Sequence, residues 1–597
     1  MCGIVGYVGK KNCIPILIDG LKNLEYRGYD SAGIAFLDDN QIKVIKKQGR
    51  LVNLEESINN KYYSNLGIGH TRWATHGVAN EVNAHPHHVG DITLIHNGII
   101  ENYEELRNEL INHGYQIDTE NDTKIACAYI DYLYKNNHDM LKTLSMLKEK
   151  FKGSYALGIL VNGSDKLYAI RKDSPLIIGV SNDGNYIASD VFAILNETNK
   201  YIVLDNNEVV ILDNKVNVYN NGVLVDKKIL TFNHKADEIT KNGYSHFMLK
   251  EIHEQDNLAK KLIDMYLENK DTIINKMPCF DKYDKIDIVA CGSAYHAGMI
   301  GKSLIEEYGD IPVSVNLASE YRYKKLFLND KTLVIAISQS GETADTLASV
   351  NIAKQNNADT LGIVNVALSS IARVCDNVLY TNAGPEIAVA TTKAYSMQVL
   401  MLTLIALNIG VSKNLIDKDK LDYIINNYRL LPSKIKEEIN KNYSDIAKQI
   451  YNKNDIFFIG RGIDYAISLE GSLKMKEISY IHSEAYAAGE LKHGTISLIE
   501  DGTLVIGVLT QSELYEKTIS NMVECKSRGA YLCGLTSYGN YNIEDTVDFT
   551  TYIPKTDVHF AASLAVVPLQ LMGYYVSVAR GLDVDKPRNL AKSVTVE

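Results

Sequence analysis

The sequence predicts an α+β layered domain followed by two copies of an α/β domain with a doubly wound parallel sheet. Three observations support this fold class. Short apolar runs bounded by Gly, Asn or Asp recur over the first third of the 597-residue chain, as strands do in a layered domain. Further along, continuous apolar runs alternate with helical segments, which is typical of a parallel sheet covered on both faces. That alternation then occurs a second time.

The first domain is expected over residues 2–217. Its residues Tyr103, Leu106, Leu110 and Ile111 recur at helical spacing and predict a helix over Asn102–His113. The apolar runs that predict its strands are Gly3–Val8, Gly33–Leu37, Thr93–Ile95, Ala156–Val161, Leu176–Val180 and Tyr201–Leu204.

Residues 218–275 are richer in polar and charged residues, as in NHKADEITKNG, and are predicted to form a linker with an entry helix. The first α/β domain is expected over residues 276–416, where Ile286–Ala290, Thr332–Ile337 and Leu361–Val364 predict parallel strands.

The second α/β domain is expected over residues 447–587. The segment KNDIFFIGRGIDYAISLEG is similar in sequence to the earlier segment KIDIVACGSAYHAGMIGKS, and TLVIGVLTQSE is similar to the earlier TLVIAISQSGE. These similarities predict a tandem duplication of one unit. Leu421–Asn440, between the copies, is charged and predicted helical, and residues 588–597 form a tail without core residues.

Composition excludes several classes of protein. Lys and Arg number 62 against 73 Asp and Glu, so a nucleic-acid partner is not expected. The eight cysteines form no CxxC, which fits a reducing cytosol rather than a disulfide framework or zinc ribbon. The apolar stretch Val399–Val411 is shorter than the about 20 residues that span a bilayer. MCGIVGYVGK lacks the features of a secretory signal, so we expect a cytoplasmic protein without a membrane partner.

Cys2 follows Met1 directly, so removal of Met1 would give an N-terminal cysteine. Its own α-amine, with a pKa of about 7.7–8.0, could then act as base for the thiol. A cysteine at this position could also be accidental.

Four further sites in the sequence carry polar groups. GHTRWATHG contains Arg72, whose guanidinium fits a carboxylate. Asn97-Gly98 is either a hairpin turn or an oxyanion hole made of an amide and a backbone N–H. HPHH at 85–88 lacks Cys or carboxylate partners at ligand spacing, so no metal is expected. Asp122 is either a turn residue or the partner of an ammonium group.

The motifs CGIVG, LEYRGYDSAG, HTRWATHG, NAHPH, HNGIIENY and the Asp of NDT resemble the class II glutamine amidotransferase family. That resemblance implies an N-terminal-nucleophile sandwich of αββα layers. It implies that Cys2 attacks the glutamine amide, that Asn97 and Gly98 hold the oxyanion, and that a thioester, glutamate and ammonia follow. It also implies that the glutamine α-carboxylate meets Arg72 and the α-amine Asp122, with Thr75, His76 and His85 nearby.

In the C-terminal part, SQSGET ends a predicted parallel strand and opens a helix, where hydroxyls and free backbone N–H groups could bind a phosphate. An ordinary Ser-capped helix is the alternative. The parallel loop CGSAY could face the same crevice. The second copy reads TQSE, with Glu513 at the glycine position, and is predicted to have lost phosphate binding.

The segment EGSLKMKEISYIHSEAYAAGELKHG supplies titratable groups. Lys474 and Glu477 share a helix face, either as an exposed ion pair or as a buried pair that moves a proton between sugar carbons. His493 is a loop histidine or an acid–base group. Lys592 is an inert tail residue or, in a pocket, a Schiff-base lysine.

This half resembles the tandem sugar-isomerase (SIS) domains of phosphosugar enzymes, and the whole order of motifs resembles the glucosamine-6-phosphate synthase family. The resemblance implies conversion of fructose 6-phosphate and glutamine to glucosamine 6-phosphate. It implies phosphate binding, a fructosimine on Lys592, and proton transfer by Glu477 with Lys474. His493, from a partner subunit of a homodimer, would assist ring opening, and Trp73 would gate an ammonia channel. The phosphate-binding residues so implied are Ser293, Ser338, Gln339, Ser340 and Thr343.

No metal or organic cofactor is expected, because an aldose–ketose shift needs only acid–base groups. Two positions depart from the family pattern: Ala294 replaces a hydroxyl residue of the CGTSY loop, and Thr495 replaces a proline. A non-catalytic phosphosugar sensor is the alternative function, although a sensor needs neither Glu477 nor Lys592. An amidotransferase that feeds another acceptor would need a different synthetase fold.

Overall fold

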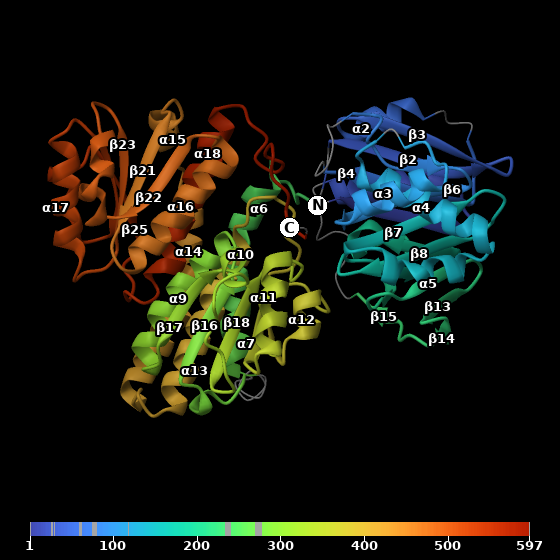
Figure 1. The fold of residues 1–597 in the computed structure, drawn as a ribbon. Coiled ribbons are helices and arrows are strands. Elements are labelled where there is room, and N and C mark those ends of the chain that lie inside the picture. The colour runs from blue at the N-terminus through green and yellow to red at the C-terminus, as the bar shows by residue number, and fades with distance from the viewer. Residues whose placement is uncertain are drawn as a thin grey trace. The chain divides into compact units, whose positions relative to one another are not determined.

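The computed structural model describes residues 2–25, 28, 30–58, 62–73, 80–117, 119–232, 240–268 and 277–595. The chain divides into two compact units (Figure 1). Unit 1 comprises Met1–Ile239 with Ala591–Glu597, and unit 2 comprises Thr240–Leu590.

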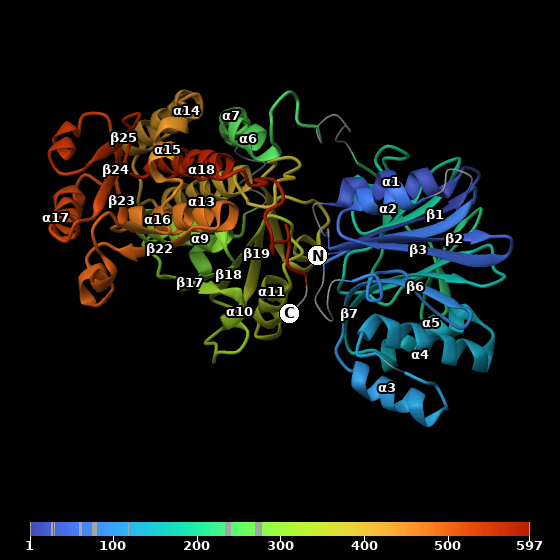
Figure 2. The same ribbon diagram turned by 90° about the horizontal axis from the view of Figure 1, so that it is seen from above.

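Unit 1 consists of two antiparallel sheets between helices. The first sheet has the strand order β15-β11-β9-β10-β1-β4-β2-β3, and the second has the order β14-β13-β12-β8-β7-β6-β5. Figure 2 shows α1 and α2 on the outer face of the first sheet and α3, α4 and α5 on the outer face of the second. The predicted αββα sandwich is confirmed.

The strands of the first sheet are β1 (Gly3–Gly9), β2 (Ser31–Asp38), β3 (Gln41–Gln48), β4 (Leu66–Arg72), β9 (Ile177–Val180), β10 (Gly184–Ala188), β11 (Lys200–Val203) and β15 (Leu230–Thr231). Those of the second are β5 (His87–Val89), β6 (Ile92–Ile100), β7 (Gly153–Val161), β8 (Leu167–Lys172), β12 (Val209–Leu212), β13 (Val216–Asn220) and β14 (Val223–Val225). The helices are α1 (Cys13–Leu24), α2 (Leu51–Ser57), α3 (Tyr103–Asn112), α4 (Asp122–Asn137) and α5 (Met140–Lys150).

The sandwich forms because the strands alternate between two cores. On β6, Ile95 packs between the sheets with Ile4 and Ile187. Its neighbour Leu94 points to the other face and packs with Tyr129 of α4. A period of two in side-chain direction thus gives one strand two buried faces.

The chain expected to be a linker contains regular structure. Strands β13, β14 and β15 extend the sheets of unit 1 to Thr231. The turn residues Asn221 and Gly222 join β13 to β14, and both have positive φ. Helices α6 (Phe247–His253) and α7 (Gln255–Glu268) contribute Met248, Ile252 and Leu262 to the core of unit 2.

Unit 2 contains two five-stranded sheets, β17-β16-β18-β19-β20 and β22-β21-β23-β24-β25. All strand pairs in both sheets are parallel, and each sheet has its second strand at the edge beside the first. The identical order confirms the predicted tandem α/β domains. Figure 1 shows helices on both faces of the first sheet, with α9 and α13 opposite α11.

The strands are β16 (Lys285–Ala290), β17 (Val313–Leu317), β18 (Thr332–Ser338), β19 (Asp359–Val364), β20 (Asn377–Tyr380), β21 (Asp455–Gly460), β22 (His482–Ala487), β23 (Leu504–Leu509), β24 (Tyr531–Ser537) and β25 (Phe549–Ile553). The helices are α9 (Ser293–Gly309), α10 (Ala318–Tyr321), α11 (Ala344–Gln355), α12 (Ser370–Val374), α13 (Lys393–Ser412), α14 (Lys418–Ile439), α15 (Ser444–Ile450), α16 (Ile463–Ser479), α17 (Tyr515–Lys526) and α18 (Ala561–Ala579).

Two helices of unit 2 have the length and apolar composition of a membrane span. In α13 and α18, 94% and 89% of the apolar window is buried inside the fold. Both contribute residues such as Leu404 and Leu564 to the main core. They are therefore the central core helices of unit 2.

Candidate functional site

The predicted nucleophile lies just before β1 in unit 1. The backbone N–H of Trp73 donates a hydrogen bond to the Cys2 Sγ over 3.2 Å, and Asn97 Nδ2 donates to the Cys2 carbonyl oxygen over 2.9 Å. Burial raises the pKa of the Cys2 thiol, whereas the Trp73 hydrogen bond and the Arg72 charge act to lower it. The structure thus brings Cys2, Trp73 and Asn97 together.

Asn97 and Gly98 lie within β6 and not in a turn. They pair with Ala156 and Tyr155 of β7, so the hairpin alternative does not apply. Gly98 has φ of +126°, and a Cβ there would lie 2.0 Å from the Ser154 carbonyl oxygen. Only glycine fits this conformation and this space.

His70 orients the Asn97 amide. Its Nε2 lies 3.0 Å from both the His96 carbonyl oxygen and Asn97 Oδ1. Both partners are acceptors, so Nε2 carries the proton and donates, which directs Asn97 Nδ2 toward Cys2. Burial lowers the pKa of His70 to about 3, so the ring is neutral. His70 lies in the HTRWATHG motif, and no role was predicted for it from the sequence.

Arg72 ends β4 and is 4% exposed. Burial lowers the pKa of its guanidinium, while the charges of Cys2, Asp30 and Asp122 act to raise it. Cys2, Asp30 and Asp122 are therefore close enough for their charges to act on Arg72.

Asp122 begins α4 and accepts backbone hydrogen bonds from Ile100 over 3.1 Å and from Thr123 over 2.8 Å. His85 stacks on His70 with ring centroids 4.1 Å apart. Thr75 and His76 lie outside the described residues.

The four buried histidines of this region, His70, His85, His87 and His96, all have their pKa values lowered by burial. Within the described ranges, no three His, Cys, Asp or Glu residues are arranged to hold a metal ion.

In unit 2, the loop after β18 gathers the predicted phosphate-binding hydroxyls. Ser338 Oγ lies 2.9 Å from Thr343 Oγ1 and accepts the Gly341 N–H over 3.0 Å. Ser340 Oγ accepts the Glu342 N–H over 3.1 Å. Gly341 has φ of +65°, and a Cβ there would lie 2.0 Å from Ser369 Oγ. Gln339 lies in the same loop, where its carbonyl oxygen accepts the Asn365 N–H.

The corresponding loop of the second copy holds a carboxylate of the chain itself. Asp464, 1% exposed, accepts the N–H groups of Thr510 and Gln511 over 2.8 and 3.2 Å and the Thr510 hydroxyl over 2.5 Å. Asp464 is the second residue of α16, as Ala294 is of α9. The glycines before these helices, Gly462 and Gly292, have nearly equal φ and ψ.

Helix α16 carries the predicted acid–base pair. Lys474 Nζ donates to Glu477 Oε2 and lies 3.5 Å from Glu470 Oε1. Burial acts to lower the pKa of the fully buried Lys474, but the charges of Glu477 and Glu470 outweigh it and raise the pKa. Lys474 is therefore an ammonium group between two carboxylates, and the exposed-pair alternative does not apply to it.

Ser293 begins α9, and its Oγ donates to Glu470 Oε1 over 2.9 Å. Glu470 was not predicted as a site residue, although it lies four residues before Lys474 on the same helix face. A fully buried carboxylate at that spacing could have been suspected, but its partners in α9 are 174 and 177 residues away.

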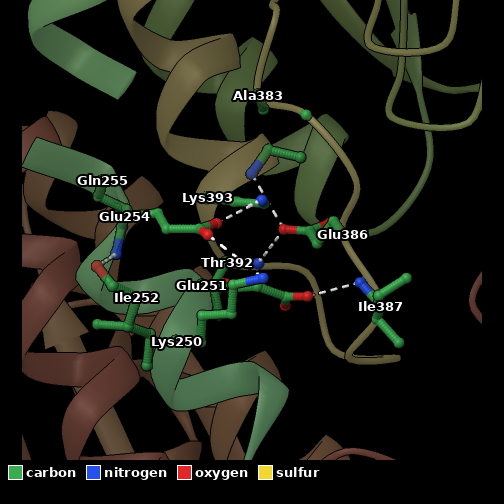
Figure 3. Close-up of polar contacts among 12 residues, drawn as sticks. Lys250, Glu251, Ile252, Glu254, Gln255, Ala383, Glu386, Ile387, Thr392 and Lys393 are labelled. Carbon is green, nitrogen blue, oxygen red and sulfur yellow. Dashed lines mark hydrogen bonds and ion pairs between the residues drawn. The ribbon is translucent and has the colours of Figure 1, made fainter. Parts of the chain in front are cut away.

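The loop between β20 and α13 is fixed by two carboxylates (Figure 3). Glu251 accepts the N–H groups of Ile387 and Ala388 over 2.5 and 3.1 Å. Glu386 accepts those of Thr392 and Ala394, both over 3.0 Å. The Glu386 charge also acts to raise the pKa of Lys474, so this loop borders the acid–base pair.

A second ion pair supports the same loop. Lys393 Nζ binds Glu254 Oε2 over 2.6 Å, and Lys250 lies 3.6 Å from the other Glu254 oxygen. Figure 3 shows Glu254 pointing from the α6–α7 junction toward Lys393. The predicted linker thus supplies charged groups that hold part of unit 2.

Two further predicted residues belong to other segments of the chain. His493 is exposed at the end of a short 3₁₀ helix, Glu490–His493. Lys592 is partly buried and lies in the segment Ala591–Glu597, which groups with unit 1. Their roles remain predictions.

Family models match both parts of the chain. The glutamine amidotransferase domain model matches residues 70–196. The SIS domain model matches twice, over residues 280–408 and 449–580.

Similar proteins carry both parts in one chain. The glutamine–fructose-6-phosphate aminotransferase (isomerizing) of Clostridium tetani is 49% identical over 100% of both chains. That of Methanosarcina acetivorans is 42% identical over 100% of both. The solved C-terminal domain of the glucosamine-fructose-6-phosphate aminotransferase from Francisella tularensis is 36% identical and covers 58% of this chain and 100% of its own, with a TM-score of 0.54.

Proposed function

This chain belongs to the family of isomerizing glutamine–fructose-6-phosphate aminotransferases, and from that premise we propose how its two units carry out the reaction. The enzyme transfers the amide nitrogen of glutamine to fructose 6-phosphate and isomerises the product. Glucosamine 6-phosphate and glutamate result.

The observation that carries the glutamine half is the placement of Cys2 beside Asn97 and Trp73. With Met1 removed, the Cys2 thiolate attacks the glutamine amide carbon. The Asn97 amide and the Gly98 N–H stabilise the oxyanion, a class of contact worth several kcal/mol, about 3–4, in acyl transfer. Arg72 and Asp122 bind the α-carboxylate and α-ammonium of glutamine. Ammonia leaves, and water releases glutamate from the thioester.

In unit 2, the Ser338–Thr343 loop binds the sugar phosphate through hydroxyls and backbone N–H groups. Lys592 forms the fructosimine with the open-chain ketose. Glu477 moves the proton between C1 and C2, because a carboxylate beside an ammonium group such as Lys474 can accept and return a proton. The buried position of Lys474 between two carboxylates supports this assignment.

The finer features of the enzyme also belong to this proposal. Ammonia passes from Cys2 to the ketose within the protein, with Trp73 as gate, because ammonia released to water would be protonated. The enzyme works as a cytoplasmic homodimer in which His493 of one copy assists ring opening in the other.

A stoichiometry assay tests the proposed function. Glutamate and glucosamine 6-phosphate should form in a ratio near one per glutamine and fructose 6-phosphate consumed. Glutamate without amino sugar would contradict coupled transfer. A phosphosugar sensor would bind fructose 6-phosphate without any turnover.

Two variants test which residue carries out each half of the reaction. Cys2→Ala should abolish glutamine hydrolysis while sugar phosphate still binds, and Lys592→Ala should block amino-sugar formation but spare some glutaminase activity. Full glutamine-dependent activity in Cys2→Ala would refute the nucleophile assignment.

A further inference from the structure

We propose that His296 is a positioning residue of the isomerase reaction: its Nδ1–H holds the Glu470 carboxylate, which in turn keeps Lys474 in place against Glu477. The proposal rests on the acid–base roles proposed above for Lys474 and Glu477. His296 itself does not touch the sugar.

The contacts form a chain from the first SIS copy into the second. His296 lies in the first turn of α9, and its Nδ1 is 2.8 Å from Glu470 Oε2 on α16. The other Glu470 oxygen accepts Ser293 Oγ over 2.9 Å and lies 3.5 Å from Lys474 Nζ. Because a carboxylate only accepts, Nδ1 is the protonated nitrogen of His296.

Glu470 and Lys474 are buried, so each of the contacts that they make matters. The side chains of Glu470 and Lys474 are both 0% exposed, and that of His296 is 12% exposed. A buried carboxylate that loses a donor must find another, because desolvated charge without partners is costly.

Lys474 is the group that would move. It is shared unequally between Glu477, the closer partner, and Glu470 at 3.5 Å. As long as His296 and Ser293 each donate to one Glu470 oxygen, Lys474 stays with Glu477. Without the His296 donor, Glu470 draws the ammonium toward itself, and Glu477 loses part of its cation.

Other charged and titratable groups face this chain. The Glu386 carboxylate, from the loop before α13, adds to the field at Lys474. Tyr395 of α13 is fully buried beside Glu470, and its hydroxyl makes no hydrogen bond within the described chain. The Glu386 carboxylate cannot donate a hydrogen bond, and the Tyr395 hydroxyl makes none to Glu470.

The arrangement also explains why this histidine lies where it does. His296 follows the CGSAY loop, so the helix that begins at the phosphate-facing loop also holds the carboxylate behind the acid–base pair. His296 and Glu470 lie 174 residues apart in the sequence, and their contact links the first SIS copy to the acid–base pair of the second.

The test compares three variants of the full chain. His296→Asn keeps an N–H near the Nδ1 position, whereas His296→Gln places its amide near Nε2, and His296→Ala removes the donor. For amino-sugar formation we expect kcat to fall about tenfold in the Ala and Gln variants, with little change in KM for fructose 6-phosphate, and near-normal kcat in the Asn variant.

The pH profile separates positioning from folding. In the Ala and Gln variants the acidic limb of kcat should move about half a unit or more to higher pH, because Glu477 has lost part of its cation. The Asn variant should keep the original limb. Thermal unfolding of unit 2, which contains His296, should stay unchanged in all three and reports on folding.

Equal kcat and pH profiles in all variants would overturn the proposal, as would an Asn variant no better than Gln. Glu477→Gln, measured in parallel, tests the proposed function separately. If Glu477→Gln abolishes isomerisation while the His296 variants behave as wild type, only the positioning role is refuted.

Discussion

At the scale of single residues, Gly98 combines a backbone conformation that favours glycine with a proposed role in binding the oxyanion. Gly98→Ala places a Cβ 2.0 Å from a carbonyl oxygen at φ of +126°. Strain of this kind costs about 1–3 kcal/mol before the clash is counted. We expect glutamine hydrolysis to be lost and thermal unfolding of unit 1 to occur at lower temperature.

Gly114→Ala is the matched control for this prediction. Gly114 also has positive φ, +86°, but its Cβ would meet nothing within 4 Å. It should show the smaller loss of stability and keep glutaminase activity. Equal effects in the two variants would show that the Ser154 contact is unimportant.

Asp464 gives the second residue-scale prediction, a dependence of stability on pH. Burial raises its pKa to about 7. An acid whose pKa rises on folding favours the folded state most below its unfolded pKa of about 3.9, and that contribution is lost as pH rises through about 7.

In Asp464→Asn, an amide can donate to the Thr510 hydroxyl and accept the two N–H groups without titrating. Chemical denaturation of unit 2 at pH 5, 6, 7 and 8 should therefore show a decline for the wild type that is absent in the variant. Parallel curves would mean that Asp464 is ionised throughout.

The limits of sequence reasoning are visible at the same scale. Arg72, Asn97 and Asp122 were singled out because they sit in distinctive local motifs, and their roles stay predictions. Glu470 and Asp464 were not, because each looks like an ordinary helical carboxylate until the fold supplies donors from distant segments. Glu251 and Glu386 belong to the same class, since their partners are backbone N–H groups of one loop.

At the scale of elements, the two SIS copies differ at the second residue of one helix. Ala294 leaves the first loop open, whereas Asp464 occupies the second. Ala294→Asp should place a carboxylate over the Ser338 loop and weaken sugar-phosphate binding by at least about tenfold through like-charge repulsion.

Ala294→Ser is its control, because it adds a hydroxyl without charge. A hydrogen bond to a charged group contributes about 1.5–3 kcal/mol, so this variant should bind fructose 6-phosphate more tightly. Calorimetric titration measures the affinity of both variants for fructose 6-phosphate. Unchanged affinity in Ala294→Asp would mean that the first loop does not receive the phosphate.

Strands were predicted correctly where the apolar pattern of the sequence matches the burial of the strand in the fold. The continuous apolar runs became β16, β18 and β19, each buried on both faces. Strand β3, QIKVIKKQ, was missed because it lies at a sheet edge and carries lysines. Strands β13 to β15 were missed because short, half-exposed pairs give little apolar signal.

At the scale of the whole molecule, each unit has its own sheets and its own cores. Residues 1–239, which lack the Ala591–Glu597 segment of unit 1, and residues 240–597 should each fold when expressed separately. The first should hydrolyse glutamine and the second should bind fructose 6-phosphate. Circular dichroism and the two assays measure this. A fragment 1–239 that fails to fold would show that unit 1 depends on the rest of the chain.

The order of domains was predictable because repeats and motifs are long-range signals that survive in one sequence. The boundary at residue 217 was set by composition, whereas the division into units falls at Ile239. A boundary drawn from composition excludes polar segments. The polar strands β14 and β15 nevertheless belong to unit 1, because they pair within its two sheets.

The carboxylate in the second loop has a consequence for the empty enzyme. Backbone N–H groups of an anion-binding loop are hydrated when no anion is bound. The Thr510 and Gln511 N–H groups, by contrast, always donate to the Asp464 carboxylate. Amide hydrogen exchange should therefore be slow at Thr510 and Gln511 in the apo state. In the Ser338 loop, where the Gly341 and Glu342 N–H groups donate to serine hydroxyls, exchange should slow further after sugar phosphate is added. After the duplication, only this copy would then respond to its ligand.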